Sequence, residues 1–251
     1  MPSDAQKNHQ IATAILTYHR VVGQSATPHE FYDVDVAHFR QQIDLLAHRV
    51  VRQGEQLLWL DGGQAVCLTF DDGTSDHAQV GRLLQQHGLT GTFFVVAGRI
   101  GAPGCLSAAQ IRDLAAQGHR IGSHTMTHRQ LPTLSDAEIA DEIRTSRAVL
   151  EDLSGQTVDW LAPPGGSLCP RSRAIAEECG MRVIRTMDWG YAPSPLAGVV
   201  PALPVLRFYG LPGFRRLLDG RAVLWPYRVK RWAKNLLGAD KYVALRNRLG
   251  G

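Results

Sequence analysis

Two short stretches of the sequence carry residues that could bind a metal ion. Asp71 and Asp72 follow the apolar run 65–70 (AVCLTF) and precede a glycine, and His124 and His128 lie four residues apart further along the chain. Two imidazoles and one carboxylate form a three-ligand set for a divalent cation and leave room for water. The second carboxylate is then free to accept a proton. Together the stretches predict a metal-dependent hydrolase, although each alone is also typical of a turn or a solvated helix face.

The elements around these residues predict an α/β fold with parallel strands. Apolar runs predict strands, and helical periodicity with capping boxes at Ser107 and Ser135 predicts the helices between them. Expected strands cover residues 11–18, 66–70, 90–96, 120–123, 157–162 and 182–186. Expected helices cover residues 36–50, 77–87, 107–117, 135–153 and 170–179. Each candidate metal ligand follows a strand closely, and barrel enzymes place their active sites at that end of their strands.

Composition limits the cellular setting. The 251 residues are 44% hydrophobic and 20% charged, which is ordinary for a globular protein. The four cysteines form no C-x-x-C pair, a usage that fits a reducing compartment, and Cys67 is expected to be a buried, inert thiol. Residues 1–10 are polar and lack the apolar core of a signal peptide, and no run reaches the ~18 apolar residues of a membrane span. We therefore expect a cytoplasmic protein.

Residues 69–73 (TFDDG) and 124–128 (HTMTH) resemble the first two motifs of the polysaccharide deacetylases, also called the NodB-homology or carbohydrate esterase family 4 enzymes. Similar context is found at residues 16–21 (LTYHRV), 92–96 (TFFVV) and 118–124 (GHRIGSH). The resemblance implies a distorted (β/α) TIM-like barrel of the NodB-homology type over residues 11–210, preceded by a polar tail, 1–10. It also implies a hydrolase of non-peptide carbon–nitrogen bonds. Such an enzyme removes an N-acetyl group from an amino sugar in a polysaccharide, lipid-linked glycan or glycoconjugate.

Carried over to this sequence, the resemblance assigns the metal to Asp72, His124 and His128 and makes Asp71 the catalytic base. Zn²⁺ is the first expectation for such ligands, and other divalent ions suit the same set. Two alternatives stay open for the function as a whole. One is a non-catalytic carbohydrate-binding or scaffolding member of the same fold, and the other is a deacetylase of a small sugar-nucleotide or lipid precursor.

The sequence departs from the family pattern in two places. The family usually takes the proton for the leaving amine from a histidine on a late strand, but all ten histidines here fall at or before His128. A subgroup resembles a circular permutation with this histidine placed early, so we expect His19 to be the general acid; packing at a strand end is the alternative. The second departure is Ala162, which stands where the family has an arginine that orients the catalytic aspartate. Arg185 and Arg207 are the candidate replacements.

Further residues are expected to contact the substrate. Pro164 and Gly165 belong to the turn 161–166 (LAPPGG), which resembles the family's third motif. Asp188 and Trp189 resemble the fourth motif, whose tryptophan walls the acetyl pocket, although a core tryptophan is nearly as plausible. Tyr18 is expected to line the cleft, with a purely structural role as its alternative.

Positive charge is concentrated at the end of the chain. Residues 207–251 carry a net charge of +9, against −5 for the preceding 206 residues. The segment 211–251, expected to be a helical extension, mixes basic residues with aromatic ones, as interfacial helices do. Peripheral contact with the inner face of the membrane is therefore one expectation, and a solvated helix that covers one end of the barrel is the other. No nucleic acid partner is expected, because no nucleic-acid module accompanies the charge.

Overall fold

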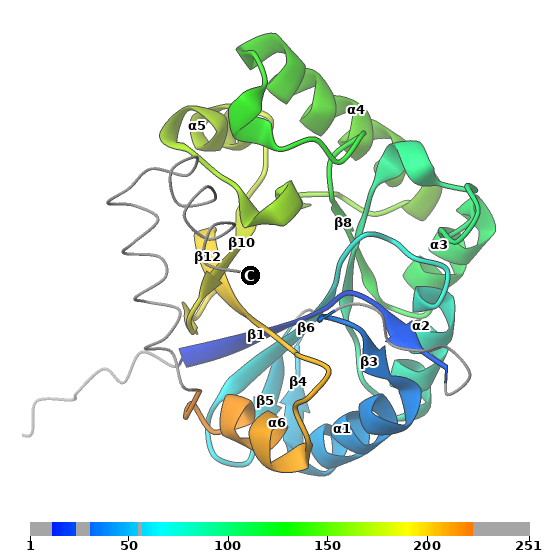
Figure 1. The fold of residues 1–251 in the computed structure, drawn as a ribbon, viewed down its shortest axis with the longest axis vertical. Coiled ribbons are helices and arrows are strands. Elements are labelled where there is room, and N and C mark those ends of the chain that lie inside the picture. The colour runs from blue at the N-terminus through cyan, green and yellow to red at the C-terminus, as the bar shows by residue number, and fades with distance from the viewer. Residues whose placement is uncertain (1–11, 24–30, 55–56, 223–251) are drawn as a thin grey trace, which may run out of the picture.

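A computed structural model describes residues 12–23, 31–54 and 57–222 as a barrel of parallel strands with helices on its outside (Figure 1). Seven strands close the barrel in the order β1, β6, β7, β8, β9, β10 and β12, and β12 pairs with β1 again. Their bounds are β1 Ala12–Tyr18, β6 Ala65–Phe70, β7 Thr92–Val95, β8 Arg120–Ser123, β9 Trp160–Leu161, β10 Val183–Trp189 and β12 Gly198–Pro204. The predicted (β/α) barrel is confirmed.

Short strands extend this barrel at its edges. Antiparallel β11 (Ala192–Pro193) pairs with β1, antiparallel β5 (Leu58–Leu60) pairs with β6, and β4 (Val50–Gln53) pairs with β5. A separate parallel pair joins β2 (Val21–Val22) to β3 (Val34–Asp35). The helices are α1 Val36–Arg49, α2 His77–Gln86, α3 Ala108–Ala116, α4 Asp136–Ser154, α5 Pro170–Glu178 and α6 Leu211–Leu218.

Local sequence signals fix most helix ends. Both predicted capping boxes are present: the Ser107 hydroxyl accepts from the Gln110 amide, and Ser135 pairs in the same way with Glu138. Gly155 ends α4 in the left-handed conformation, with φ of 67°. The late strands were predicted less well. β10 runs on to Trp189, and β12, which contains two prolines, is not among the strands expected from the sequence.

The position of β1 determines which residues meet at the mouth of the barrel. It lies between β12 and β6, with Leu16 opposite Leu203 and Tyr18 opposite Phe70. The first strand is thus adjacent to the last, as expected for His19 to serve in place of a late histidine. Because β1 and β6 are parallel and in register, His19 and Asp71 leave the sheet at the same level.

The start of the basic extension packs against the barrel. Helix α6 buries Phe214, Leu217 and Leu218, and the Asp219 carboxylate that follows it lies 2.6 Å from an Arg49 guanidinium nitrogen at the end of α1. This first part of the extension therefore packs beside α1 on the outside of the barrel. Residues 223–251 and the tail 1–10 lie outside the described residues. Within the described part of the chain, no helix combines the length and the hydrophobicity needed to cross a membrane.

Candidate active site

Asp72, His124 and His128 converge at the ends of β6 and β8, as the sequence predicts. The Asp72 Oδ1 atom lies 3.3 Å from His124 Nε2 and 3.2 Å from His128 Nε2. One ligand atom from each residue falls within 4.8 Å of the other two. Ligand atoms held ~2.1 Å from a tetrahedral ion lie ~3.4 Å apart, so these spacings suit a small divalent cation.

The orientation of His124 also fits a metal ligand. Its Nδ1 donates a hydrogen bond to the Ala162 carbonyl oxygen at 2.6 Å, and a carbonyl can only accept. The proton is therefore on Nδ1, which leaves the lone pair of Nε2 directed at Asp72 and available for a cation. Position 162 thus contributes its backbone to the site, whichever side chain it carries.

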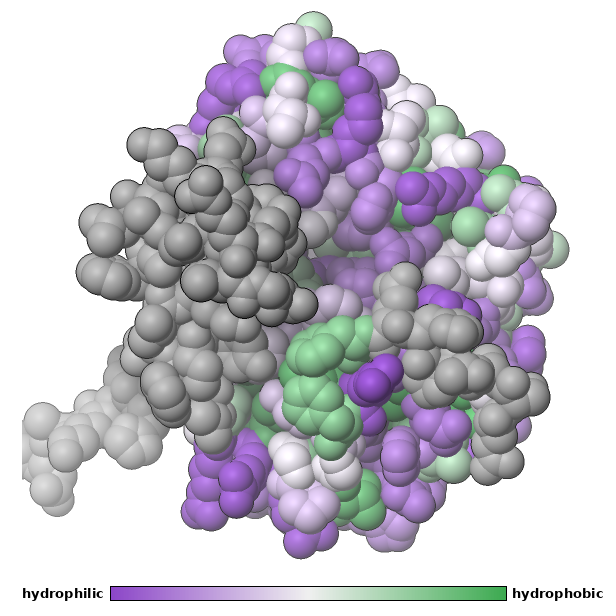
Figure 2. Space-filling view, viewed as in Figure 1, coloured by the Kyte–Doolittle hydropathy of each residue, from purple (hydrophilic) through white to green (hydrophobic). Residues whose placement is uncertain are grey.

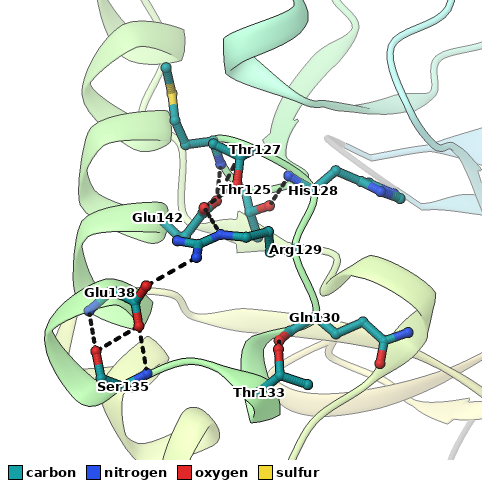
Figure 3. A network of polar contacts seen from close by, with 10 residues as sticks. Thr125, Thr127, His128, Arg129, Gln130, Thr133, Ser135, Glu138 and Glu142 are labelled. Atoms are coloured by element: carbon teal, nitrogen blue, oxygen red, sulfur yellow. Dashed lines mark hydrogen bonds and ion pairs between the residues drawn. The ribbon is translucent and has the colours of Figure 1, made fainter.

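The loop that carries His128 is fixed by one buried carboxylate, Glu142 of α4. It accepts hydrogen bonds from the amides of Met126 and Thr127 at 2.9 and 2.8 Å, from the Thr127 hydroxyl, and from Arg129 Nε at 3.3 Å. Figure 3 shows Glu142 reaching from the helix into the loop, while the His128 ring points to the opposite side. These bonds hold the pKa of Glu142 below its usual value although burial alone would raise it. Sequence analysis did not single out Glu142.

Three residues of the site have left-handed backbone conformations that non-glycine residues seldom adopt. The φ angles are 75° at Asp72, 66° at Thr125 and 66° at His128. The glycine after Asp72 is required by space as well: a Cβ on Gly73 would lie 3.0 Å from a methyl carbon of Val95. The backbone around the candidate metal ligands is therefore held in an uncommon shape by its surroundings.

Asp71 forms a buried ion pair with Arg185 inside the barrel. The Asp71 side chain is 3% exposed and the Arg185 side chain 1%, and the guanidinium donates directly to Asp71 Oδ1. Burial alone would raise the pKa of Asp71, but Arg185, His124 and His19 hold it below its usual value. Of the two arginines considered as replacements for the arginine absent at Ala162, Arg185 is the one that contacts the carboxylate.

His19 lies on the other side of Asp71. Its Nε2 is 3.9 Å from Asp71 Oδ2, and its ring stacks on Tyr32 with centroids 4.7 Å apart. His77 Nε2 donates to the His19 carbonyl oxygen at 2.5 Å and so fixes the backbone at this position. Burial lowers the pKa of His19, against the opposing effect of Asp71 and Asp72.

These side chains surround one cavity of about 240 Å³. Its lining residues are His19, Tyr32, Asp71, Asp72, His124, His128, Gly165, Gly166 and Met187. Tyr32 and Met187 were not predicted from the sequence, because neither belongs to a stretch with a recognisable pattern. Gly166 has to be a glycine here, since a Cβ would lie 2.4 Å from the Met187 amide nitrogen.

Four predicted substrate contacts lie outside the lining of this cavity. Tyr18 is the clear correction: its ring is fully buried, stacks on Phe70, and donates to Gln42 at 2.9 Å, so it belongs to the core between barrel and helices. Pro164 is buried, Trp189 packs against the main hydrophobic core, and Asp188 is exposed at the end of β10. Of the five residues expected to contact substrate, Gly165 alone lines the cavity.

Comparison with known proteins agrees with the geometry. The profile of the family described as "Polysaccharide deacetylase" matches residues 61–184. A chitooligosaccharide deacetylase from Bradyrhizobium sp. (strain ANU 289) is 30% identical over 166 residues, which cover 61% of this chain and 74% of that protein. The chain belongs to the polysaccharide deacetylase family. The peptidoglycan-N-acetylglucosamine deacetylase PgdA of Listeria monocytogenes is 34% identical over 133 residues, which is 50% of this chain. The family member described here spans about a quarter (27%) of the length of PgdA.

Solved structures share the fold of this deacetylase family member. Streptococcus pyogenes deacetylase PplD, in complex with acetate, superposes with a TM-score of 0.70 at 20% identity and covers 84% of this chain and 99% of its own. IcaB from Ammonifex degensii superposes with a TM-score of 0.69 at 24% identity, covering 84% and 98%. At these identities the likeness establishes the barrel fold alone.

Proposed function

We propose that this protein is a metal-dependent hydrolase that removes an N-acetyl group from an amino sugar in a glycan or glycoconjugate. The observation that carries the proposal is that a His₂Asp ligand set, an arginine-paired carboxylate and a histidine all border one cavity. Named relatives support the substrate class, since they are deacetylases of peptidoglycan N-acetylglucosamine and of chito-oligosaccharides. Zn²⁺ is the first candidate for the cation, because His and Asp ligands suit it.

Asp72, His124 and His128 would hold the cation, and a divalent ion there supplies Lewis acidity toward a carbonyl and acidifies water. Asp71 accepts the proton of the attacking water, because Arg185 keeps it ionised and directed into the cavity. The proton that Asp71 has accepted passes to His19, and His19 donates it to the sugar nitrogen as the carbon–nitrogen bond breaks. The products are acetate and a free amine. The 3.9 Å separation of Asp71 Oδ2 and His19 Nε2 supports these two roles, because a proton can pass between neighbouring groups.

Arg185 and His19 weaken the case for a non-catalytic member of the fold. That reading drew weight from the absence of an arginine at position 162 and of a late histidine. Arg185 contacts Asp71 directly, and His19 occupies the other side of the same carboxylate. Both missing chemical groups therefore have a counterpart beside Asp71, supplied from other positions of the chain.

Metal analysis combined with acetate release tests the proposal. The purified protein should contain about one divalent ion per chain by mass spectrometry and release acetate from N-acetylated chito-oligosaccharides. Asp71→Asn should keep the metal and lose activity, and Asp113→Asn, at an exposed site on α3, is the matched control. His19→Ala should lower kcat without changing the metal content. A protein that releases no acetate from a broad panel of glycans even when loaded with metal would favour the non-catalytic reading.

We also propose that the basic extension 211–251 brings the enzyme to a membrane surface. Support comes from the net charge of +9 over residues 207–251 and from the arginines that α6 exposes. Flotation of the protein with anionic vesicles should depend on this charge and fall as salt rises. A cytoplasmic location stays a prediction from the sequence.

A further inference from the structure

Two exposed aromatic side chains meet on the described surface. Among the described residues four large hydrophobic side chains are exposed, namely Phe31 at 50%, Val51 at 69%, Phe208 at 61% and Leu211 at 37%. Phe31 and Phe208 come from distant parts of the chain, yet their rings lie 5.3 Å apart at 71°. The Arg207 amide also donates to the Phe31 carbonyl at 3.3 Å and joins the two segments. We call Phe31, Phe208 and Leu211, which follows Phe208 closely in the chain, the rim patch.

The rim patch continues directly into the candidate active site. The Phe31 ring packs edge-on against Tyr32, at 5.6 Å, and Tyr32 stacks on His19. Tyr32 and His19 both line the active-site cavity. Figure 2 shows a hydrophobic patch beside a polar hollow at this end of the barrel, over the segment that leaves β12. Whatever contacts the patch therefore also faces the mouth of the cavity.

Positive charge lies on α6, the helix that begins at Leu211 of the rim patch. Helix α6 turns its apolar side chains inward, which leaves Arg215 and Arg216 exposed on its outer side. A groove of about 570 Å³ beside the helix is lined by Leu211, Pro212, Arg215, Arg216, Asp219 and Arg221. The acidic member, Asp219, is already paired with Arg49. The sequence beyond the described residues adds seven Lys or Arg against one Asp.

We propose that the rim patch and the outer arginines of α6 dock the mouth of the barrel onto an anionic lipid bilayer. Phenylalanine and leucine next to arginine is the combination that interfacial proteins place at the boundary between headgroups and acyl chains. The side chains of Phe31, Phe208 and Leu211 offer apolar surface for acyl chains and no hydrogen-bonding group for the hydroxyls of a sugar, so a bilayer fits better than a sugar chain. Given the proposed function, on which this substrate assignment rests, the substrate is a glycan attached to a membrane lipid.

Vesicle sedimentation of the full chain tests the docking surface. The wild-type protein should bind phosphatidylcholine vesicles that contain phosphatidylglycerol and bind pure phosphatidylcholine only weakly. Phe31→Ser/Phe208→Ser should weaken binding about tenfold or more, because it removes two large apolar contacts. Arg215→Gln/Arg216→Gln should weaken it by a similar factor at low salt.

Matched controls separate the patch from general surface properties. Val51→Ser removes an equally exposed hydrophobic residue outside the patch, and Arg82→Gln/Arg112→Gln removes two exposed arginines from α2 and α3. Both controls should bind vesicles like the wild type. Thermal unfolding verifies that each variant is folded, and Phe31→Leu/Phe208→Leu, which keeps apolar side chains, should retain binding.

Several outcomes would overturn the docking surface. Equal binding to both kinds of vesicle would do so, and so would wild-type binding by the Phe31→Ser/Phe208→Ser variant. If that variant bound vesicles normally but lost activity on long soluble chito-oligosaccharides, the patch would be a sugar platform instead. Repeating the assay with Asp71→Asn keeps it independent of catalysis, so an inactive enzyme leaves the test of docking intact.

Discussion

Replacing Arg185 by methionine should leave the buried Asp71 carboxylate without its positive partner. Both side chains are almost fully buried, and the guanidinium lies over the Phe94 ring at 5.0 Å as well as on the carboxylate. Removing one partner of a buried ion pair leaves the other charge uncompensated and typically costs about 3–5 kcal/mol of folding stability. We expect a loss within this range for Arg185→Met at neutral pH.

The loss should depend on pH in a defined direction. In the wild type the pKa of Asp71 lies below its usual value, so Asp71 contributes stability above the unfolded pKa of ~3.9, and that stability is lost as pH falls through the folded pKa. Without Arg185, burial should raise the pKa of Asp71 instead. The difference in unfolding free energy between wild type and Arg185→Met should therefore be largest at neutral pH and shrink toward pH ~4.

The pH dependence of activity should also reflect the raised pKa of Asp71. A base with a raised pKa is protonated over more of the pH range, so the acid limb of kcat/KM should move to higher pH in Arg185→Met, and high pH should restore part of the activity. Urea unfolding and pH–rate profiles measure the two effects. Arg207→Met is the matched control, because Arg207 is exposed and was the other candidate from the sequence. Adding Asp71→Asn to Arg185→Met removes both charges and should recover part of the lost stability.

An unchanged acid limb in Arg185→Met, with stability lowered equally at all pH values, would show that Arg185 acts only through packing. A shift of the acid limb in Arg207→Met would show that Arg207 influences the pKa of Asp71. Either result would refute the assignment of Arg185 as the group that keeps Asp71 ionised.

Two further predictions follow from other contacts. Glu142→Gln should weaken metal binding about 10- to 100-fold, because an amide cannot accept all the hydrogen bonds that fix the His128 loop. Competition with a chelator measures the metal affinity, and an unchanged affinity would contradict this prediction. Among the cysteines, Cys169 should react with iodoacetamide at pH 8 well before Cys67. Hydrogen bonds with Ser172 lower the pKa of Cys169, while burial raises the pKa of Cys67 to about 12. Peptide mass spectrometry measures the order of labelling, and labelling of Cys67 first would contradict the prediction.

The sequence was most informative where chemistry and local structure coincide. Asp72, His124 and His128 were predicted together because each follows a strand, and parallel strands of a barrel end on the same side. Tyr18 shows the limit of this reasoning. Every residue of β1 after Ala12 is buried, so the strand lacks the alternation of apolar and polar residues that would show which side chains face the barrel interior. Tyr18 points to the helix layer, whereas Thr17 bonds to Thr69 of the neighbouring strand.

Arg185 could not be chosen over Arg207 from the sequence, because the choice depends on the register of distant strands. Asp71 and Arg185 are 114 residues apart and meet only because β10 and β6 belong to the same closed barrel. The substitution at position 162 is nevertheless consistent with the site. Ala162 keeps the contact that depends on the backbone, since its carbonyl accepts from His124 Nδ1, and any residue can supply that. The contact that needs a positive side chain has moved to another strand. In this protein Arg185 of β10 supplies the positive charge that lies against Asp71 inside the barrel.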